Sequence, residues 1–194
     1  MSISRTLLRS SLFLGIVAAI LAWIVIGVSW RLNPWFVFTR DAFSDLGGPH
    51  ACCPWIYNYG LILVGVLVSA WSIPLYYFAK TKLEAIGAGY MLLAGIFLAL
   101  IGVFPSGTRP HVFISTWFFV QADLAFIALS AGMTRRKTPV GRILLAISLL
   151  AFPVAAAIEA TIGWPSTATI EAYGIAVIDV GVILATLEYY KTSQ

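Results

Sequence analysis

The stretch RSSLFLGIVAAILAWIVIGVSW (residues 9–30) carries a single charged side chain, Arg9, in a run of mostly apolar residues. A helix needs roughly 20 such residues to cross the ~30 Å hydrocarbon core of a bilayer. Five further segments have the same character, at about 56–78, 85–103, 111–133, 139–161 and 168–190. The sequence therefore predicts an all-α polytopic membrane protein, with one six-helix transmembrane domain over residues 1–194.

The composition supports this class of protein. Of the 194 residues, 60% are hydrophobic and 10% are charged, whereas soluble domains carry about 25% charged residues. The first apolar run exceeds the roughly 7–15 residues of a signal-peptide core and no clean cleavage site follows it, so we expect it to remain as the first span. Too few residues lie outside the spans for a separate soluble domain. We therefore expect a multi-pass protein of the cell membrane.

Lys and Arg are distributed unevenly among the connections. Nine of the twelve fall at the two termini and in the second and fourth connections, and three, Arg31, Arg40 and Arg109, fall on the other side. Because cytoplasmic loops carry the excess of basic residues, the sequence predicts six spans with both termini inside. The basic segment MTRRKT (residues 133–138) is then a short hairpin between spans, and no nucleic-acid partner is expected.

The first connection, residues 31–55, is long for so compact a protein, and long connections are commonly functional. It contains RDAFSDLGGPHACCPW (residues 40–55) and is rich in aromatic residues and Pro, which argues against disorder. Thr39 as N-cap, Asp41 in the first turn and Gly47 as a left-handed end predict a short helix within it. We expect this segment to fold back onto the outer membrane surface.

The predicted short helix is amphipathic. Asp41, Ser44 and Asp45 stand at i, i+3 and i+4 and share one face, whereas Phe43 and Leu46 share another face that could lie on the bilayer. Two interpretations remain open at this point. The polar face is either a solvated helix surface, whose Asp residues cap and solubilise, or one wall of a polar site.

The connection FPSGTRP (residues 104–110) and the residue after it emerge on the same predicted face. Ionisable groups of five spans therefore gather there: Asp41, Asp45, His50, Arg109, His111, Glu159 and Glu171. A lone charge near hydrocarbon is costly, so we expect Arg109 to pair with Asp45 or Glu171. Such convergence is typical of a headgroup or small-ligand site, and an ordinary salt-bridge network remains the alternative.

From this convergence we predict a ligand site made by Ser44, Asp45, Gly47, Arg109 and His111. Ser44 would position a headgroup oxygen, and Asp45 would orient Arg109 or His111. Arg109 would meet an anionic group, and Gly47 would end the helix so that its polar face stays directed at the cleft.

Cys52 and Cys53 are the two cysteines of the chain, and they are adjacent. Redox proteins commonly use Cys-x-x-Cys, which is absent, so two thiols or an incidental disulfide between neighbours are expected. A metal site from His50, Cys52, Cys53 and His111 is conceivable by ligand type, but adjacent cysteines rarely point at one ion. We expect no metal and no cofactor.

Two carboxylates lie within the apolar spans. Asp123 is near the centre of the fourth span and Asp179 near the centre of the sixth, and a rise of about 1.5 Å per residue puts both close to the midplane. Intramembrane acids are candidates for proton relays or cation ligands. Asp123 and Asp179 are therefore a candidate proton or ion site, and local hydrogen bonding that fixes helix packing is the alternative.

Two short elements carry a family resemblance: Ser-x-Leu-Gly after the first span (Ser44, Leu46, Gly47) and Phe-Pro…His after the third (Phe104, Pro105, His111). Together with residues 33–48, 54–67 and 102–119, they resemble the archaeal and bacterial membrane proteins grouped as the domain of unknown function 998 family. The resemblance covers nearly the whole chain and implies six spans with both elements on one face. It supplies no reaction.

Three functions remain open. The first is binding of a lipid headgroup or another amphiphile in the outer cleft, with membrane lipids as partners and a homo-oligomer or a larger membrane complex allowed. The second is a membrane-embedded lipid-modifying enzyme at the same cleft; Ser44, Asp45 and His111 supply the residue types of a triad without its geometry. The third is a small proton- or cation-coupled transporter that uses Asp123 and Asp179.

Overall fold

The computed structural model describes residues 4–193, and its regular elements in that range are all helical. Six helices, counting α1 and α2 together, are long and apolar enough to cross a membrane, which confirms the predicted class. The elements are α1 (Arg5–Ser11), α2 (Leu14–Leu32), the short 3₁₀ helix η1 (Phe43–Gly47), α3 (Pro54–Tyr77), α4 (Lys82–Val103), α5 (His111–Arg135), α6 (Pro139–Thr161) and α7 (Thr167–Thr192).

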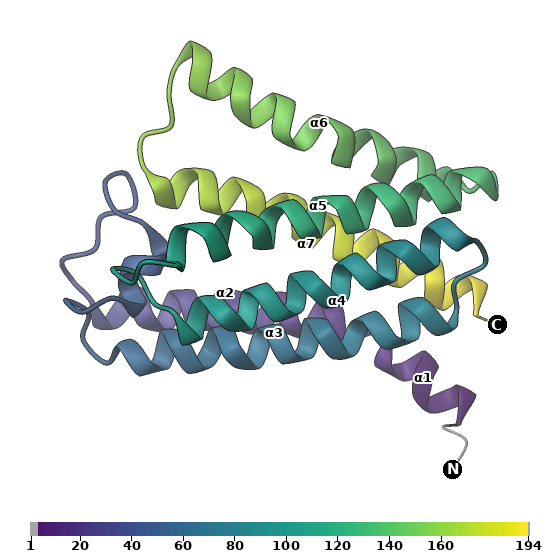
Figure 1. Cartoon of the computed structure of the whole chain (residues 1–194), viewed down its shortest axis with the longest axis horizontal. Coiled ribbons are helices and arrows are strands. Elements are labelled where there is room, and N and C mark those ends of the chain that lie inside the picture. Colours follow the sequence, from purple (N-terminus) through teal and green to yellow (C-terminus); the bar gives the residue numbers. More distant parts are fainter. Residues whose placement is uncertain (1–3, 194) are drawn as a thin grey trace.

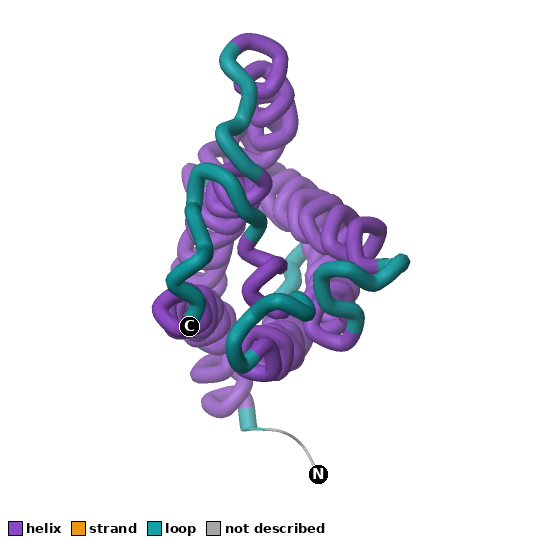
Figure 2. Tube along the Cα trace, turned by 90° about the vertical axis from the view of Figure 1, so that its left-hand side faces the viewer, coloured by secondary structure: helices purple, strands orange, loops and turns teal. Residues whose placement is uncertain are grey.

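The long helices form a ring in chain order (Figures 1 and 2). Each packs against the next, and α2 packs against α7 to close the ring. Neighbouring helices run antiparallel, and the connections between them are short except for the first, residues 33–53. Close approach is achieved at small residues: a Cβ on Gly95 would collide with the backbone and side chain of Ser69 on α3, and a Cβ on Gly181 would lie 2.7 Å from the Phe126 ring on α5.

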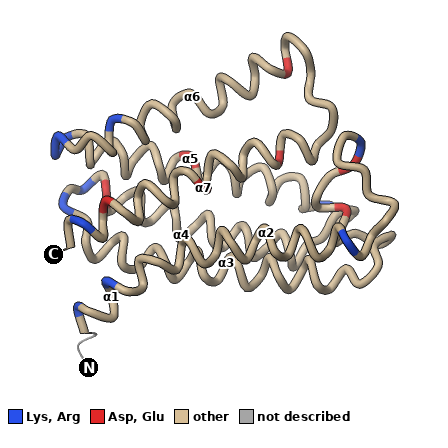
Figure 3. Tube along the Cα trace, turned by 180° about the vertical axis from the view of Figure 1, so that it is seen from behind, with Lys and Arg blue, Asp and Glu red and all other residues tan. Residues whose placement is uncertain are grey.

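The two ends of the bundle differ in charge (Figure 3). We call the end with both termini and the connections 78–81 and 136–138 the basic end, because most Lys and Arg lie there. We call the end with the connections 33–53, 104–110 and 162–166 the loop end. This separation is the one from which the membrane orientation is predicted, with the basic end in the cytoplasm.

Helix α6 leans away from α7 toward the loop end (Figure 1). Its buried residues are Gly141, Leu144 and Ser148, all in its first half. Beyond Ser148 no residue of α6 is buried within the described chain. The helix therefore packs tightly at the basic end and leaves its second half loosely covered.

The first connection differs from its prediction. The helix spans only residues 43–47, Ala42 precedes it as N-cap instead of Thr39, and Gly47 does not adopt the left-handed conformation. Phe43 and Leu46, expected against the bilayer, are 2% and 0% exposed. In a 3₁₀ helix residues i and i+3 lie directly above one another, so both side chains enter the bundle together.

The short helix η1 (Phe43–Gly47) therefore fills space inside the loop end of the bundle, and we call it the plug. Figure 2 shows the short helix η1 inside the ring of long helices. It contacts α2, α3 and α7, and the Phe43 ring stacks on Phe36 with centroids 5.9 Å apart. The plug buries Ser44 and leaves Asp45 half-buried.

Candidate functional site

Neighbouring elements hold the plug through its backbone. The side-chain amide of Asn58 on α3 donates to the carbonyl of Gly47 at 3.0 Å. The backbone N–H of Ala168 on α7 donates to the carbonyl of Asp41 at 3.0 Å, and the hydroxyl of Ser166 donates to the carbonyl of Phe38 at 2.6 Å. The first connection is therefore fixed at both sides of η1.

Two carboxylates receive the N–H groups at the start of η1. Asp45 Oδ2 accepts from the N–H of Ala42 at 3.0 Å, and Asp45 Oδ1 accepts from the hydroxyl of Ser106 at 2.9 Å. Glu171 Oε2, on α7, accepts from the N–H of Phe43 at 2.7 Å. The first N–H groups of a helix have no acceptor inside the helix. In η1 the acceptors are the carboxylates of Asp45 and Glu171.

A cavity of about 550 Å³ lies beside the plug, between α5, α6 and α7. At the loop end it is lined by polar side chains, which include Ser44, Asp45, Ser106, His111 and Glu171. Further along the helices the lining is mainly apolar, with Phe119, Phe126, Phe152, Val177 and Ile178. The cavity is thus polar at the loop end and mainly apolar along the helices, where Asp123 and Tyr173 add polar groups.

Two nearly buried polar side chains at this cavity keep free hydrogen-bonding capacity. Ser44 is 8% exposed, and its hydroxyl has no hydrogen-bond partner in residues 4–193. His111 is 7% exposed, and its Nδ1 lies 2.8 Å from the carbonyl of Phe104. Because a carbonyl only accepts, Nδ1 carries the proton, and in the neutral ring Nε2 remains an acceptor.

Ser44, Asp45 and His111, which have the residue types of a triad, are not arranged as one. No hydrogen bond joins any two of Ser44, Asp45 and His111 in the part of the chain that the structure describes. Asp45 instead bonds Ser106, a residue that the sequence analysis did not select although it lies in the FPSGTRP connection. Ser44 and His111 share the cavity without contact that would activate the hydroxyl.

Arg109 is exposed and does not line the cavity. Its expected ion pair with Asp45 or Glu171 is absent from residues 4–193, where Asp45 and Glu171 take backbone and hydroxyl donors. Lys and Arg are missing from the described residues that line this cavity. The predicted role of Arg109 toward an anionic group therefore has no geometric basis here.

The ion pair of the first connection is local. Arg40 Nε lies 2.8 Å from Asp41 Oδ1, and the N–H of Val37 donates to Asp41 Oδ2 at 2.7 Å. The hydrogen bond from Arg40, followed by that from Val37, holds the pKa of Asp41 below its usual range. The partners of Asp41 thus lie within the first connection. Asp41 does not line the cavity.

Asp123 and Asp179 line two neighbouring cavities. Asp123 lines the large cavity. Asp179 lines a smaller cavity of about 100 Å³, which shares Ser44, Glu171 and Ile178 with the large one. Asp179 accepts a hydrogen bond from Trp23 Nε1 at 2.7 Å. No hydrogen bond joins the two carboxylates in residues 4–193, and the paired proton or ion site stays a prediction.

The family model described as "Protein of unknown function (DUF998)" matches residues 16–188. The chain belongs to the DUF998 family. The match extends from α2 to α7 and therefore includes the plug, both cavities and the connections at the loop end. No curated protein and no solved structure matches the chain.

The cysteines of this DUF998 protein lie outside the cavity. Cys52 and Cys53 are free and exposed, with their sulfurs 3.5 Å apart. The hydrogen bond with Cys52 raises the pKa of the Cys53 thiol. His50 is exposed nearby, whereas His111 is turned to Phe104. Among the described residues no three His, Cys, Asp or Glu side chains are placed to hold a metal ion.

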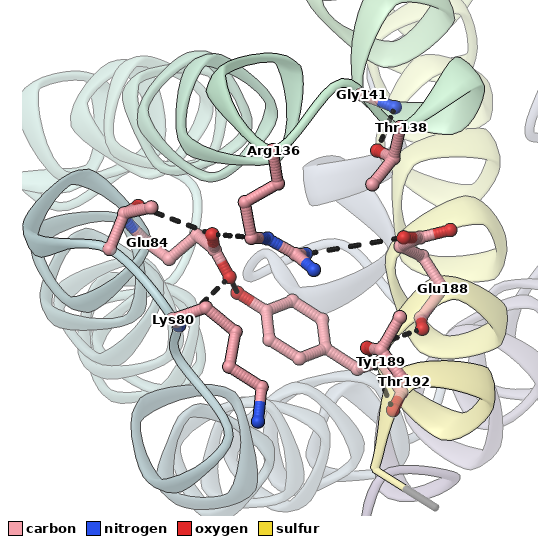
Figure 4. A network of polar contacts seen from close by, with 9 residues as sticks. Lys80, Glu84, Arg136, Thr138, Gly141, Glu188, Tyr189 and Thr192 are labelled. Atoms are coloured by element: carbon pink, nitrogen blue, oxygen red, sulfur yellow. Dashed lines mark hydrogen bonds and ion pairs between the residues drawn. The ribbon is translucent and has the colours of Figure 1, made fainter.

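A second polar cluster, at the basic end, was missed by the sequence analysis (Figure 4). Glu84 is 0% exposed. Its Oε1 accepts from Arg136 Nε at 2.8 Å and from the Thr81 hydroxyl at 3.2 Å, and its Oε2 accepts from the Tyr189 hydroxyl at 3.0 Å and the Lys80 N–H at 3.3 Å. The Thr-x-x-Glu spacing of a capping box was the available sequence signal.

Proposed function

We propose that this membrane protein binds an amphiphile in the cavity between α5, α6 and α7. The observation that carries the proposal is the shape of that cavity: about 550 Å³, polar at the loop end and apolar along the helices. Small-molecule sites commonly have about 300–1,000 Å³ and a mainly apolar lining with a few polar groups. An amphiphile has the same division into a polar head and an apolar chain.

The polar end lies where a headgroup would be. Ser44, Asp45 and Ser106 line it at the loop end, which is the predicted outer face of the bundle. A bilayer amphiphile keeps its head near the interface and its chain in the hydrocarbon, so an amphiphile in this cavity would stay parallel to its neighbours in the membrane. Binding would then need no reversal of the molecule.

The leaning of α6 supplies a route from the bilayer. Ala151, Phe152 and Ala155 on the second half of α6 line the cavity, and Phe152 is 48% exposed. In this half α6 is loosely covered, as Figure 1 shows. An amphiphile could enter sideways between α6 and α7 without passing through water.

A cavity-filling variant tests the proposal. In Ala155→Trp the indole would occupy the space that an apolar chain needs. The matched control is Ala156→Trp, one residue along α6, where the side chain is exposed and outside the cavity. We expect native mass spectrometry in mild detergent to show a co-purified amphiphile on the wild type and on Ala156→Trp. Ala155→Trp should retain several-fold less, and equal retention on all three proteins would contradict the proposal.

A further inference from the structure

The same cavity carries information on the kind of headgroup. We infer that the bound amphiphile has a cationic headgroup rich in hydrogen-bond donors, such as a primary ammonium, instead of an anionic one. This inference rests on the proposed function and deepens it. Four observations on the polar lining support it.

The charged lining is acidic throughout. Asp45, Asp123 and Glu171 contribute carboxylates, and the described lining residues include no Lys or Arg. The basic side chains nearest in the chain are otherwise placed, since Arg40 pairs with Asp41 and Arg109 is exposed. An anionic headgroup would therefore meet like charges with nothing to offset them, whereas a cation would offset charges that are costly near hydrocarbon.

The protein already uses the main donors at the polar end. The N–H groups of Ala42 and Phe43 donate to Asp45 and Glu171, and the hydroxyl of Ser106 donates to Asp45. Deeper in the cavity the Tyr173 hydroxyl donates to the carbonyl of Ala151 at 2.8 Å. A ligand that offers only acceptors, such as a carbonyl headgroup, would find few donors left.

The carboxylates that line the cavity, in contrast, keep free acceptor positions for hydrogen bonds. A carboxylate has about four acceptor positions, and Glu171 uses one of them through its bond from Phe43. Asp123 accepts no hydrogen bond from residues 4–193. An ammonium group brings three N–H donors and a positive charge, so it complements these groups in both respects.

The nearly buried side chains point to a ligand independently of the acidic groups. Ser44, with more than nine-tenths of its surface buried, lines the cavity with a hydroxyl that no described residue engages. His111 presents the acceptor Nε2, since its Nδ1 proton is held by Phe104. Buried polar groups are normally hydrogen-bonded. The free acceptor on His111 fits a partner that donates, and the Ser44 hydroxyl can accept from such a partner as well as donate to it.

Three probes of one chain length test the inference: dodecylamine, 1-dodecanol and dodecyl phosphate. Each is added at equal mole fraction to the purified full chain in dodecyl maltoside at pH 7, and binding is followed through the shift of the melting temperature. Because charge-assisted hydrogen bonds are stronger than neutral ones, we expect dodecylamine to bind roughly tenfold or more tightly than 1-dodecanol. Dodecyl phosphate should bind most weakly.

Variants separate the site from the micelle surface. Glu171→Gln keeps an oxygen for the Phe43 N–H and removes the charge, and Asp123→Asn removes the second charge; each should lower the affinity for dodecylamine several-fold and leave 1-dodecanol unchanged. Glu159→Gln is the control, because Glu159 is exposed at the loop end and outside the cavity. It should keep the wild-type preference.

The outcomes distinguish the two proposals. Equal binding of the three probes, or a preference for dodecyl phosphate, would overturn the cationic headgroup and leave amphiphile binding in place. An amine preference that survives in Glu171→Gln and Asp123→Asn would also overturn it. If none of the probes bound and Ala155→Trp also retained as much amphiphile as the wild type, the proposed function itself would fail.

Discussion

The two ends of the bundle bury carboxylates in opposite ways. At the basic end, Glu84 has four donors around its two oxygens, from Arg136, Tyr189, Thr81 and Lys80. At the loop end, Glu171 has one donor and lines an open cavity of about 550 Å³. A buried polar group costs free energy unless it is paired. The carboxylate of Glu84 is therefore satisfied within the chain, although Arg136 Nη2 is buried without a hydrogen-bond partner among the described residues, whereas the carboxylate of Glu171 keeps free acceptor positions.

The packing of the helices also differs between the two ends. The Glu84 cluster joins α4 and α7 to Arg136, the residue that follows α5, where the helices pack closely (Figure 4). At the loop end α6 leans away from α7 (Figure 1), and η1 lies inside the ring of helices (Figure 2). The cavity lies beside η1, between α5, α6 and α7. A bundle fixed at one end can keep the other end open for exchange with the bilayer.

The largest expected effect comes from breaking the closed cluster. Arg136→Ala would leave Glu84 buried without its cation and would remove the ion pair at 4.0 Å to Glu188. Removal of one partner of a buried pair commonly costs about 3–5 kcal/mol. We expect a loss of that order in the free energy of unfolding, measured from SDS titration in mixed micelles, with amphiphile retention unchanged in the folded fraction.

The neighbouring arginine is the control for this prediction. Arg135 is exposed and forms no ion pair in the described chain, so Arg135→Ala should change the free energy of unfolding by no more than about 0.5 kcal/mol. If the two variants were equally stable, the Glu84 cluster would not stabilise the basic end of the bundle, and the contrast between the two ends would fail.

A smaller effect is expected from displacing the plug. In Gly47→Ala the new methyl group would collide with the side-chain oxygen of Asn58 and lie 2.8 Å from the Tyr57 ring. Overpacking of this kind typically costs about 1–3 kcal/mol. Because η1 carries Ser44 and Asp45, we expect both a lower free energy of unfolding and weaker amphiphile retention, measured by SDS titration and native mass spectrometry.

Gly27→Ala provides the matched comparison, since a Cβ there meets nothing within 4 Å. It should leave both stability and retention near the wild-type values. A Gly47→Ala protein that lost stability but retained its amphiphile fully would show that the plug is not part of the binding site.

Much of the fold follows from the sequence because the spans are long and uniformly apolar. The predicted segments 111–133 and 168–190 correspond to α5, His111–Arg135, and α7, Thr167–Thr192. The short helix was predicted at nearly the right place but with the wrong surroundings. Its apolar residues Phe43 and Leu46 fit a membrane surface as well as a bundle interior, and only the space inside the ring decides between them.

The site was predictable in its location and less so in its membership. The convergence of the first and third connections at one end is a consequence of antiparallel spans, and Asp45 and His111 do line the cavity. Within the 104–110 connection, however, Ser106 faces Asp45 and Arg109 is exposed. Which of two residues so close together points inward depends on the turn at Gly107, with φ +91°, and charge alone does not predict this turn.

The smallest expected effect concerns Asp41, the acid of the first connection that lies outside the cavity. Its pKa is lowered chiefly by the hydrogen bond from Arg40. A carboxyl whose pKa is lower in the folded state contributes stability above its ordinary pKa of about 3.9 and loses it as the pH falls through the lower, folded value. In Asp41→Asn this contribution is absent at every pH.

We therefore expect the wild type to melt slightly above Asp41→Asn at pH 7, and the difference to vanish as the pH falls below about 3.9. Differential scanning fluorimetry over this pH range measures it. Amphiphile retention at pH 7 should be the same in both proteins, because Asp41 bonds Arg40 and Val37 and does not line the cavity. A clear loss of retention in Asp41→Asn would mean that surface charge at the loop end, and not the buried acceptors, selects the headgroup.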